Sequence, residues 1–88
     1  MTPTLFEEIV GVAARYLGRS VAPFTVSRLL IRAGIFDREA LSVADARRAL
    51  PHLRAGLGEF LTAEELQATI DQMTAVISRR DGQPEHVA

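Results

Sequence analysis

The chain has 88 residues, a formal net charge of −1, a hydrophobic fraction of 48% and no cysteine. A chain of this length forms one domain around a single core, and without cysteine it has neither disulfides nor thiolate metal sites. The balanced charge gives no electrostatic reason to expect general binding to nucleic acid or to anionic membranes.

The N-terminal segment MTPTLFEE carries acidic residues where a secretory signal peptide needs basic ones. No apolar run approaches the roughly 20 residues that span a bilayer. All 10 basic residues are arginine, a bias that GC-rich coding explains. We therefore expect a soluble, cytoplasmic protein.

The first helix is expected over about residues 4–17. Thr4 and Glu7 have the spacing of a capping box, in which each side chain satisfies a free backbone N–H at the helix start. Gly18 suits the left-handed conformation that often ends a helix. Gly11 lies within this helix and has two interpretations: a tolerated exposed glycine, or a point where another helix approaches closely.

The second helix is expected over about residues 21–33, with Ser20 as its cap and Pro23 in its first turn. It should end at Gly34, followed by Ile35 as the apolar residue of a Schellman motif. The residues expected to face the core are Ala22, Val26, Leu29, Leu30 and Ala33. Phe24 and Ile31 lie outside that stripe, so this helix is either buried on two sides or part of an interface.

Residues 36–41 form a connector, with room for one short helical turn begun by Asp37. A third helix is expected over residues 43–60, capped by Ser42. Its apolar stripe comprises Val43, Ala46, Leu50, Leu53, Leu57 and Phe60. Pro51 interrupts this segment, which is therefore one helix kinked at Pro51 or two short helices that share an apolar seam.

The last helix is expected over residues 63–79, with Thr62 and Glu65 as a second capping box. Its apolar residues are Leu66, Ile70, Met73 and Ile77. Residues 81–88 have no apolar pattern and are expected to form a flexible tail. The sequence thus predicts an all-α compact bundle of four main helices within residues 1–80, with a fifth short helix in the connector left open.

The sequence has no recognisable signature of catalysis. His52 and His86 are the only histidines, and neither has supporting ligands at a metal-binding spacing. The serines lack a glycine-rich nucleophile turn, and there is no phosphate-binding loop. We therefore expect no enzyme activity, no cofactor, no bound metal and no small-molecule substrate.

One segment is similar to a DNA-binding motif. Ala14 and Gly18 followed by Thr25-Val26-Ser27-Arg28 resemble the helix-turn-helix of LacI-type repressors, although Gly18 and Thr25 are further apart than in that motif's tight turn. Thr25, Arg28 and Arg32 share one side of the second helix, as contacts to bases and phosphates would. The neutral net charge argues against this function, which is kept as the alternative.

Protein binding is the favoured function class. Apolar residues that do not fit the core stripes group around the second helix and the connector, with arginines that could form a charged rim. The expected partner-binding residues are Phe24, Arg28, Ile31, Arg32, Phe36 and Leu41. The competing interpretation is that the connector folds back and covers this side of the helix.

A further resemblance points in the same direction. The sequences YLGRSVAPFTVSRLLIRAG and LSVADARRALPHLRAGLGEFL resemble small all-helical domains appended to bacterial signalling proteins, including Ser/Thr kinases and response regulators. The matching residues are Leu17, Gly18, Ala22, Pro23 and Arg28, with Arg19 and Ser20 as extra residues. This resemblance implies a non-enzymatic docking or oligomerisation role. The expected function is an adaptor or a subunit of a larger assembly, with another protein or a second copy as partner.

Overall fold

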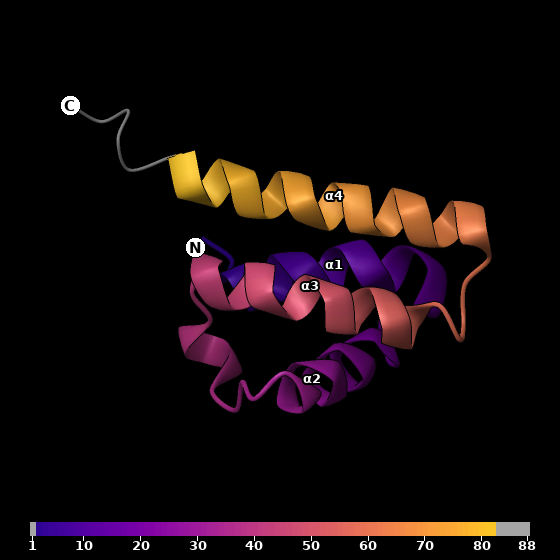
Figure 1. Cartoon of the computed structure of the whole chain (residues 1–88), viewed down its shortest axis with the longest axis horizontal. Helices are drawn as coiled ribbons and strands as arrows, with labels where there is room; N and C mark the ends of the chain where they lie inside the picture. The colour runs from indigo at the N-terminus through magenta and orange to yellow at the C-terminus, as the bar shows by residue number, and fades with distance from the viewer. Residues whose placement is uncertain (1, 83–88) are drawn as a thin grey trace.

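The computed structural model describes residues 2–82, which contain four α-helices, one short 3-10 helix and no strand (Figure 1). The elements are α1 Leu5–Leu17, α2 Ala22–Arg32, the 3-10 helix η1 Arg38–Ala40, α3 Val43–Leu57 and α4 Ala63–Gly82. The expected all-α bundle of four main helices is confirmed, and the fifth short helix left open for the connector is η1.

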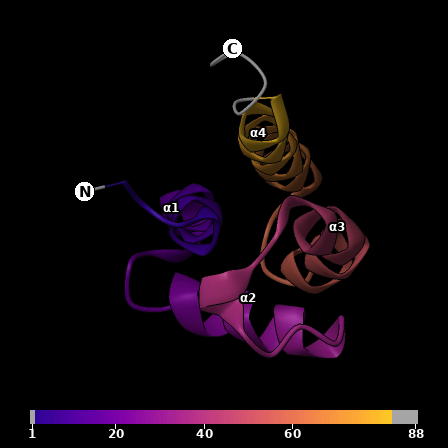
Figure 2. The same ribbon diagram turned by 90° about the vertical axis from the view of Figure 1, so that its left-hand side faces the viewer.

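The helices pack so that α1 and α3 each contact both α2 and α4. In Figure 2, α1, α3 and α4 are seen nearly end-on, whereas α2 is seen from the side and lies across the bundle. The helix α2 is on the opposite side of the bundle from α4. One long side of α2 is therefore left without a neighbouring helix.

The core lies between the four helices, and each helix contributes to it. The largest fully buried side chains are Ile9 of α1, Val26 and Leu30 of α2, Leu53 and Leu57 of α3, and Thr69, Met73 and Ile77 of α4. The Thr69 hydroxyl donates a hydrogen bond to the Glu65 carbonyl oxygen at 2.7 Å, so its burial leaves no polar group without a partner.

The expected caps of three helices are confirmed. The Glu7 N–H donates to the Thr4 hydroxyl at 3.1 Å, and the Thr4 N–H donates to the Glu7 carboxylate at 2.9 Å. In the second box the Glu65 N–H donates to the Thr62 hydroxyl at 3.2 Å, and the Thr62 N–H donates to the Glu65 carboxylate at 3.0 Å. At the start of α3 the Ser42 hydroxyl accepts a hydrogen bond from the Asp45 N–H. Each box satisfies backbone donors that the first helical turn leaves free.

The expected Ser20 cap is wrong. The helix α2 begins at Ala22 with Val21 as its N-cap residue, and no side chain accepts a hydrogen bond there. Val21 has a helical backbone conformation, whereas a capping serine adopts an extended one. Pro23 lies in the first turn as expected, where its missing N–H has little consequence.

The helix α3 is a single helix that runs through Pro51, which excludes the arrangement of two short helices for that segment. It ends at Leu57, before the expected residue 60, and the chain turns at Gly58. The turn takes Phe60 off the apolar stripe, leaving it 64% exposed. The expectation that Phe60 belongs to the core seam is therefore wrong.

The close helix–helix approach considered for Gly11 occurs instead at Gly56. A Cβ atom added at Gly56 would overlap the side chain of Leu29, whose Cδ1 would lie 2.8 Å away. A Cβ atom added at Gly11 would meet no atom within 4 Å, so Gly11 is the tolerated exposed glycine. The absence of a side chain at Gly56 lets α2 and α3 pack together.

The helix α4 continues to Gly82, beyond its expected end at Arg79. Asp81 and Gly82, assigned to the tail from the sequence, are therefore helical. The remainder of the expected tail, residues 83–88, lies outside the described residues.

Candidate functional site

The unpaired side of α2 carries large apolar side chains. Phe24 is 75% exposed and Ile31 is 51% exposed. They are seven residues apart, so they lie on the same face of the helix, two turns from each other. Arg28 lies between them on that face and is also exposed. The opposite face of α2 supplies Val26, Leu29 and Leu30 to the core.

The end of α2 fixes where the next two apolar residues point. Gly34 has a φ of 84°, and the Ile35 N–H donates to the Leu30 carbonyl while the Gly34 N–H donates to the Ile31 carbonyl, both at 2.9 Å. These are the two bonds of a Schellman motif, as expected. The motif buries Ile35 and leaves Phe36 77% exposed.

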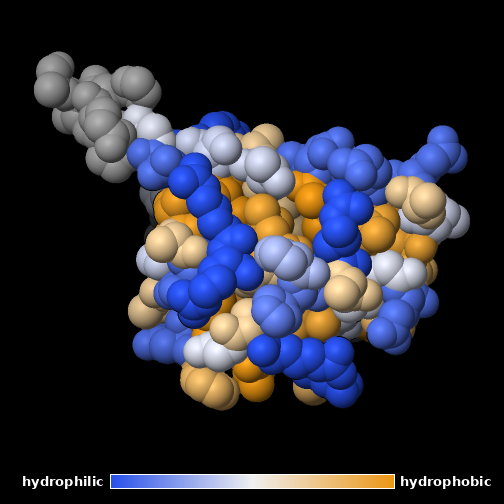
Figure 3. Space-filling view, in the orientation of Figure 1, coloured by the Kyte–Doolittle hydropathy of each residue, from blue (hydrophilic) through white to orange (hydrophobic). Residues whose placement is uncertain are grey.

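Ile31 and Phe36 together line a hollow of about 310 Å³ at this end of α2. The connector supplies its other wall, through Asp37, Arg38 and Glu39. In Figure 3, apolar atoms reach the lower edge of the molecule, where α2 and the connector lie, beside strongly hydrophilic side chains. Ile31 and Phe36 thus share one hollow at the surface.

The connector folds back on the bundle but leaves this surface open. The Arg38 guanidinium donates to the Ser27 hydroxyl at 2.7 Å and lies 5.3 Å from the centre of the Phe6 ring. These contacts fasten η1 to both α1 and α2. Neither Ile31 nor Phe36 is buried by them, so the connector covers only part of this side of α2.

Leu41 does not belong to the exposed group. It follows η1 and is 9% exposed, within the core. The backbone of η1 turns the chain back toward the bundle, which carries Leu41 inward between the connector and α3. Assigning Leu41 to an exposed partner surface was therefore wrong. We use the term α2 surface for the five remaining residues: Phe24, Arg28, Ile31, Arg32 and Phe36.

A second hollow lies on the other edge of α2. Arg28 and Arg32 line it together with Phe60 and Glu59 from the turn after α3. Phe60 thus borders the α2 surface, although the sequence pattern placed it in the core. The signal that could have located it is Gly58, a residue that often ends helices and precedes Phe60 by two positions.

The charged residues of the sequence in and around α2 are all positively charged. From Ile9 to Phe36 the sequence holds Arg15, Arg19, Arg28 and Arg32 and no acidic residue. Within residues 2–82, neither Arg28 nor Arg32 forms an ion pair. The carboxylates of Asp37 and Glu39 come only after Phe36. The α2 surface therefore carries two positive charges outside any ion pair of the described residues, and Glu59, which lines the hollow beside Arg28 and Arg32, is the acidic residue placed next to them.

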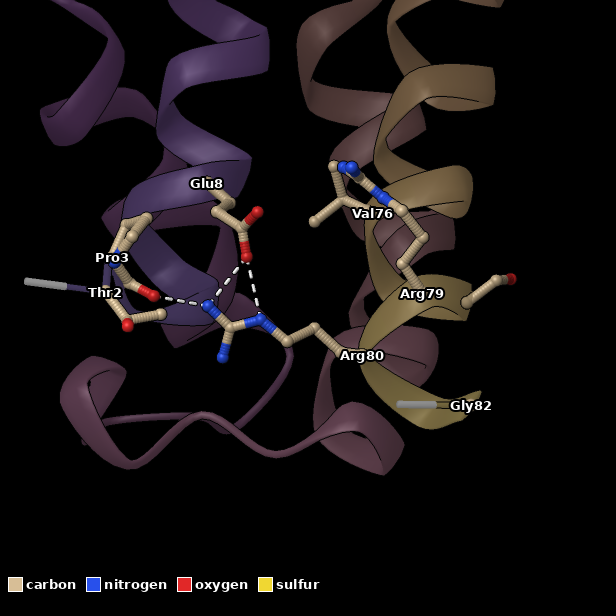
Figure 4. A pocket seen from close by; sticks show the side chains of 8 residues that line it. Thr2, Pro3, Glu8, Val76, Arg79, Arg80 and Gly82 are labelled. Carbon is tan, nitrogen blue, oxygen red and sulfur yellow. Dashed lines mark hydrogen bonds and ion pairs between the residues drawn. The ribbon is translucent and has the colours of Figure 1, made fainter. Parts of the chain in front are cut away.

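A further hollow of about 530 Å³ lies between the start of α1 and the end of α4, and an ion pair spans it. Arg80 of α4 reaches across to Glu8 of α1 (Figure 4), with 2.6 Å between guanidinium and carboxylate. The same guanidinium donates to the Pro3 carbonyl oxygen. The next residue, Asp81, pairs with Arg47 of α3 at 3.1 Å. Two adjacent residues thus fasten the end of α4 to both neighbouring helices.

Residues 2–82 contain no group of three or more histidine, cysteine or acidic residues arranged to hold a metal ion. His52 is exposed on α3, and His86 lies outside the described residues. No helix in this part of the chain is long and apolar enough to span a membrane. No protein-family model, curated protein or solved structure matches the chain, so its function is argued from its own residues.

Proposed function

We propose that this protein is a small non-enzymatic protein–protein interaction module, acting as an adaptor or as a subunit of a larger assembly. The observation that carries the proposal is the exposure of Phe24 and Ile31 on one face of α2, with the exposed Phe36 in the same hollow as Ile31. Fully burying an apolar side chain of this size contributes about 1.5–3 kcal/mol. A partner that covers all three gains a substantial part of its binding free energy from them.

Two further features support this assignment. Arg28 and Arg32 provide a polar, charged border to the apolar residues, and arginine is enriched at protein interfaces. The resemblance of Leu17, Gly18 and Pro23 to the docking domains of bacterial signalling proteins implies the same kind of role. A second copy of the chain or a different protein would use the same surface.

DNA binding through α2 is the second candidate, because the segment from Ile9 to Phe36 has four arginines and no acidic residue. Arg28 and Arg32 would then contact phosphates or base edges. Phe24 and Ile31 oppose this candidate, since they lie on the same exposed face, on either side of Arg28. Two bulky apolar groups there would face a charged sugar–phosphate surface.

The test is affinity capture from the native host with the wild-type chain and with Ile31→Glu/Phe36→Glu as baits. The matched control is Ala75→Glu/Ser78→Glu, which adds the same charge at exposed positions of α4, away from α2. We expect a specific protein that is retained by the wild type and the control, is lost with the α2 variant, and binds the purified wild-type chain directly.

Three measurements complete the test. Circular dichroism should show wild-type helicity for the α2 variant, because both substituted residues are exposed; loss of helicity would place them in the core and defeat the proposal. Light scattering identifies a second copy as the partner if the mass of the wild type is a multiple of the single-chain mass and the variant has the mass of a single chain. A DNA retardation assay at low salt that shows a shift, lost in Arg28→Gln/Arg32→Gln, would instead favour the DNA-binding candidate.

A further inference from the structure

We infer that the α2 surface binds an amphipathic helix whose apolar stripe is flanked by aspartate or glutamate residues. This inference rests on the proposed function and adds the chemistry of the partner. It follows from the spacing of Phe24 and Ile31 and from the charge of Arg28 and Arg32.

The spacing suits a helix. Phe24 and Ile31 project from the same side of α2 about 10 Å apart along the axis, at 1.5 Å per residue. A partner helix with apolar residues at i, i+3 or i+4, and i+7 presents side chains at the same interval. The hollows beside Phe36 and beside Phe60 flank the exposed face of α2, so large partner side chains have space on either side.

The charge requires acidic residues on the partner. Arg28 lies between Phe24 and Ile31, and Arg32 lies one turn further on, so any partner that covers the apolar residues also covers these guanidinium groups. Within residues 2–82 neither has a carboxylate within 4.0 Å. Covering an unpaired charge is unfavourable unless the partner supplies the opposite charge. Glu59 lines the hollow beside both arginines, and Asp37 and Glu39 line the hollow beside Phe36, so the acidic residues of the partner are required along the face between Phe24 and Ile31.

Neither α2 nor α4 of a second copy supplies these carboxylates together with large exposed apolar groups. Two α2 surfaces packed face to face would bring the arginines of both copies into one interface. The acidic residues of α4, such as Glu64 and Asp71, lie on a helix with no large exposed apolar residue among the described residues. These two faces do not match the α2 surface, and we assign the occupant to a different protein.

The experiment is a display selection with a library of 18-residue amphipathic helices. Their apolar positions follow the i, i+3, i+4, i+7 pattern, and each flanking position is drawn equally from glutamate, lysine and glutamine. The baits are the wild-type chain, Phe24→Asp/Ile31→Asp, and Arg28→Glu/Arg32→Glu, with Ala75→Glu/Ser78→Glu as control. All four substituted positions of the two α2 variants are exposed, and circular dichroism checks that each bait is folded.

We expect the wild type and the control to enrich the same helices, with glutamate at the flanking positions. Arg28→Glu/Arg32→Glu should instead enrich lysine, and Phe24→Asp/Ile31→Asp should retain none of the wild-type set. The selected peptide, measured by fluorescence anisotropy, should bind the wild type at least tenfold more tightly than its glutamine counterpart, with the difference shrinking as salt is raised.

Enrichment that depends on Phe24 and Ile31 but shows no preference for glutamate would overturn the inference while supporting an apolar docking surface. Failure to enrich any helix that distinguishes the wild type from Phe24→Asp/Ile31→Asp would also overturn it. The capture experiment with Ile31→Glu/Phe36→Glu then decides the proposed function separately, because it does not assume a helical or acidic partner.

Discussion

The side chain of Leu29 occupies the space that a Cβ atom of residue 56 would need, and Gly56 leaves that space free. Leu29 is buried on α2, and Gly56 is buried near the end of α3. The contact sets how closely these two helices pack. Because α2 carries the candidate binding residues on its other face, the contact also sets how α2 is held in the bundle.

We expect Gly56→Ala to be about 1–3 kcal/mol less favourable for stability than Gly11→Ala, because the added methyl group forces Leu29 to move in a packed core. Both substitutions gain up to about 1 kcal/mol of helix propensity. The difference between their changes in the free energy of unfolding therefore isolates the cost of the overlap with Leu29. Urea denaturation followed by circular dichroism measures both values. Equal changes in the free energy of unfolding would show that Leu29 moves without cost.

The Glu8–Arg80 ion pair should stabilise the fold measurably. Its side chains are 25% and 28% exposed, so solvent screens the pair only partly, and we expect a coupling energy of about 1 kcal/mol. A double-mutant cycle with Glu8→Gln and Arg80→Gln measures it. The matched control is the more exposed Asp45–Arg48 pair, expected to contribute about 0.3 kcal/mol. A coupling that is no larger than the control would contradict this prediction.

Gly34→Ala should lower stability by about 1 kcal/mol, because Gly34 has a φ of 84° that alanine adopts only with strain. Gly34→Asn is the matched variant, expected to lose less, since asparagine tolerates positive φ better. Thermal unfolding of the two variants compares these costs. A loss that is the same for both residues would indicate that the backbone conformation is not the cause.

The division between core and surface around the connector can be tested with Leu41→Ala and Phe36→Ala. We expect Leu41→Ala to cost about 2–4 kcal/mol, as for other buried leucines, and Phe36→Ala to change stability by no more than about 0.5 kcal/mol. Chemical denaturation measures both. Comparable losses would place Phe36 in the core and remove it from the α2 surface.

Features set by nearby residues could be predicted from the sequence. The capping boxes at Thr4 and Thr62 and the Schellman ending at Gly34 each depend on side chains or backbone within a few positions. Helical periodicity separated Phe24 and Ile31 from the apolar stripe of α2, because it fixes which residues share a face. It left open whether that second face is buried or exposed, which the structure decides.

Features set by the packing of distant segments could not be predicted in this way. The assignments of Leu41 and Phe60 were reversed because both lie just outside a helix, where periodicity no longer determines direction. The contact between Gly56 and Leu29 and the pairing of Glu8 with Arg80 join helices whose relative positions the sequence pattern does not specify.

The order in which the helices pack has a consequence for how fast the chain folds. Within residues 2–82, α1 packs on α2, α2 on α3 and α3 on α4, and only the α1–α4 interface joins helices from opposite ends of the sequence. Contacts between neighbouring helices close short loops, and bundles dominated by them fold in microseconds to milliseconds. Docking of α4 against α1, held by Arg80, is the step that joins the two helices furthest apart in the sequence.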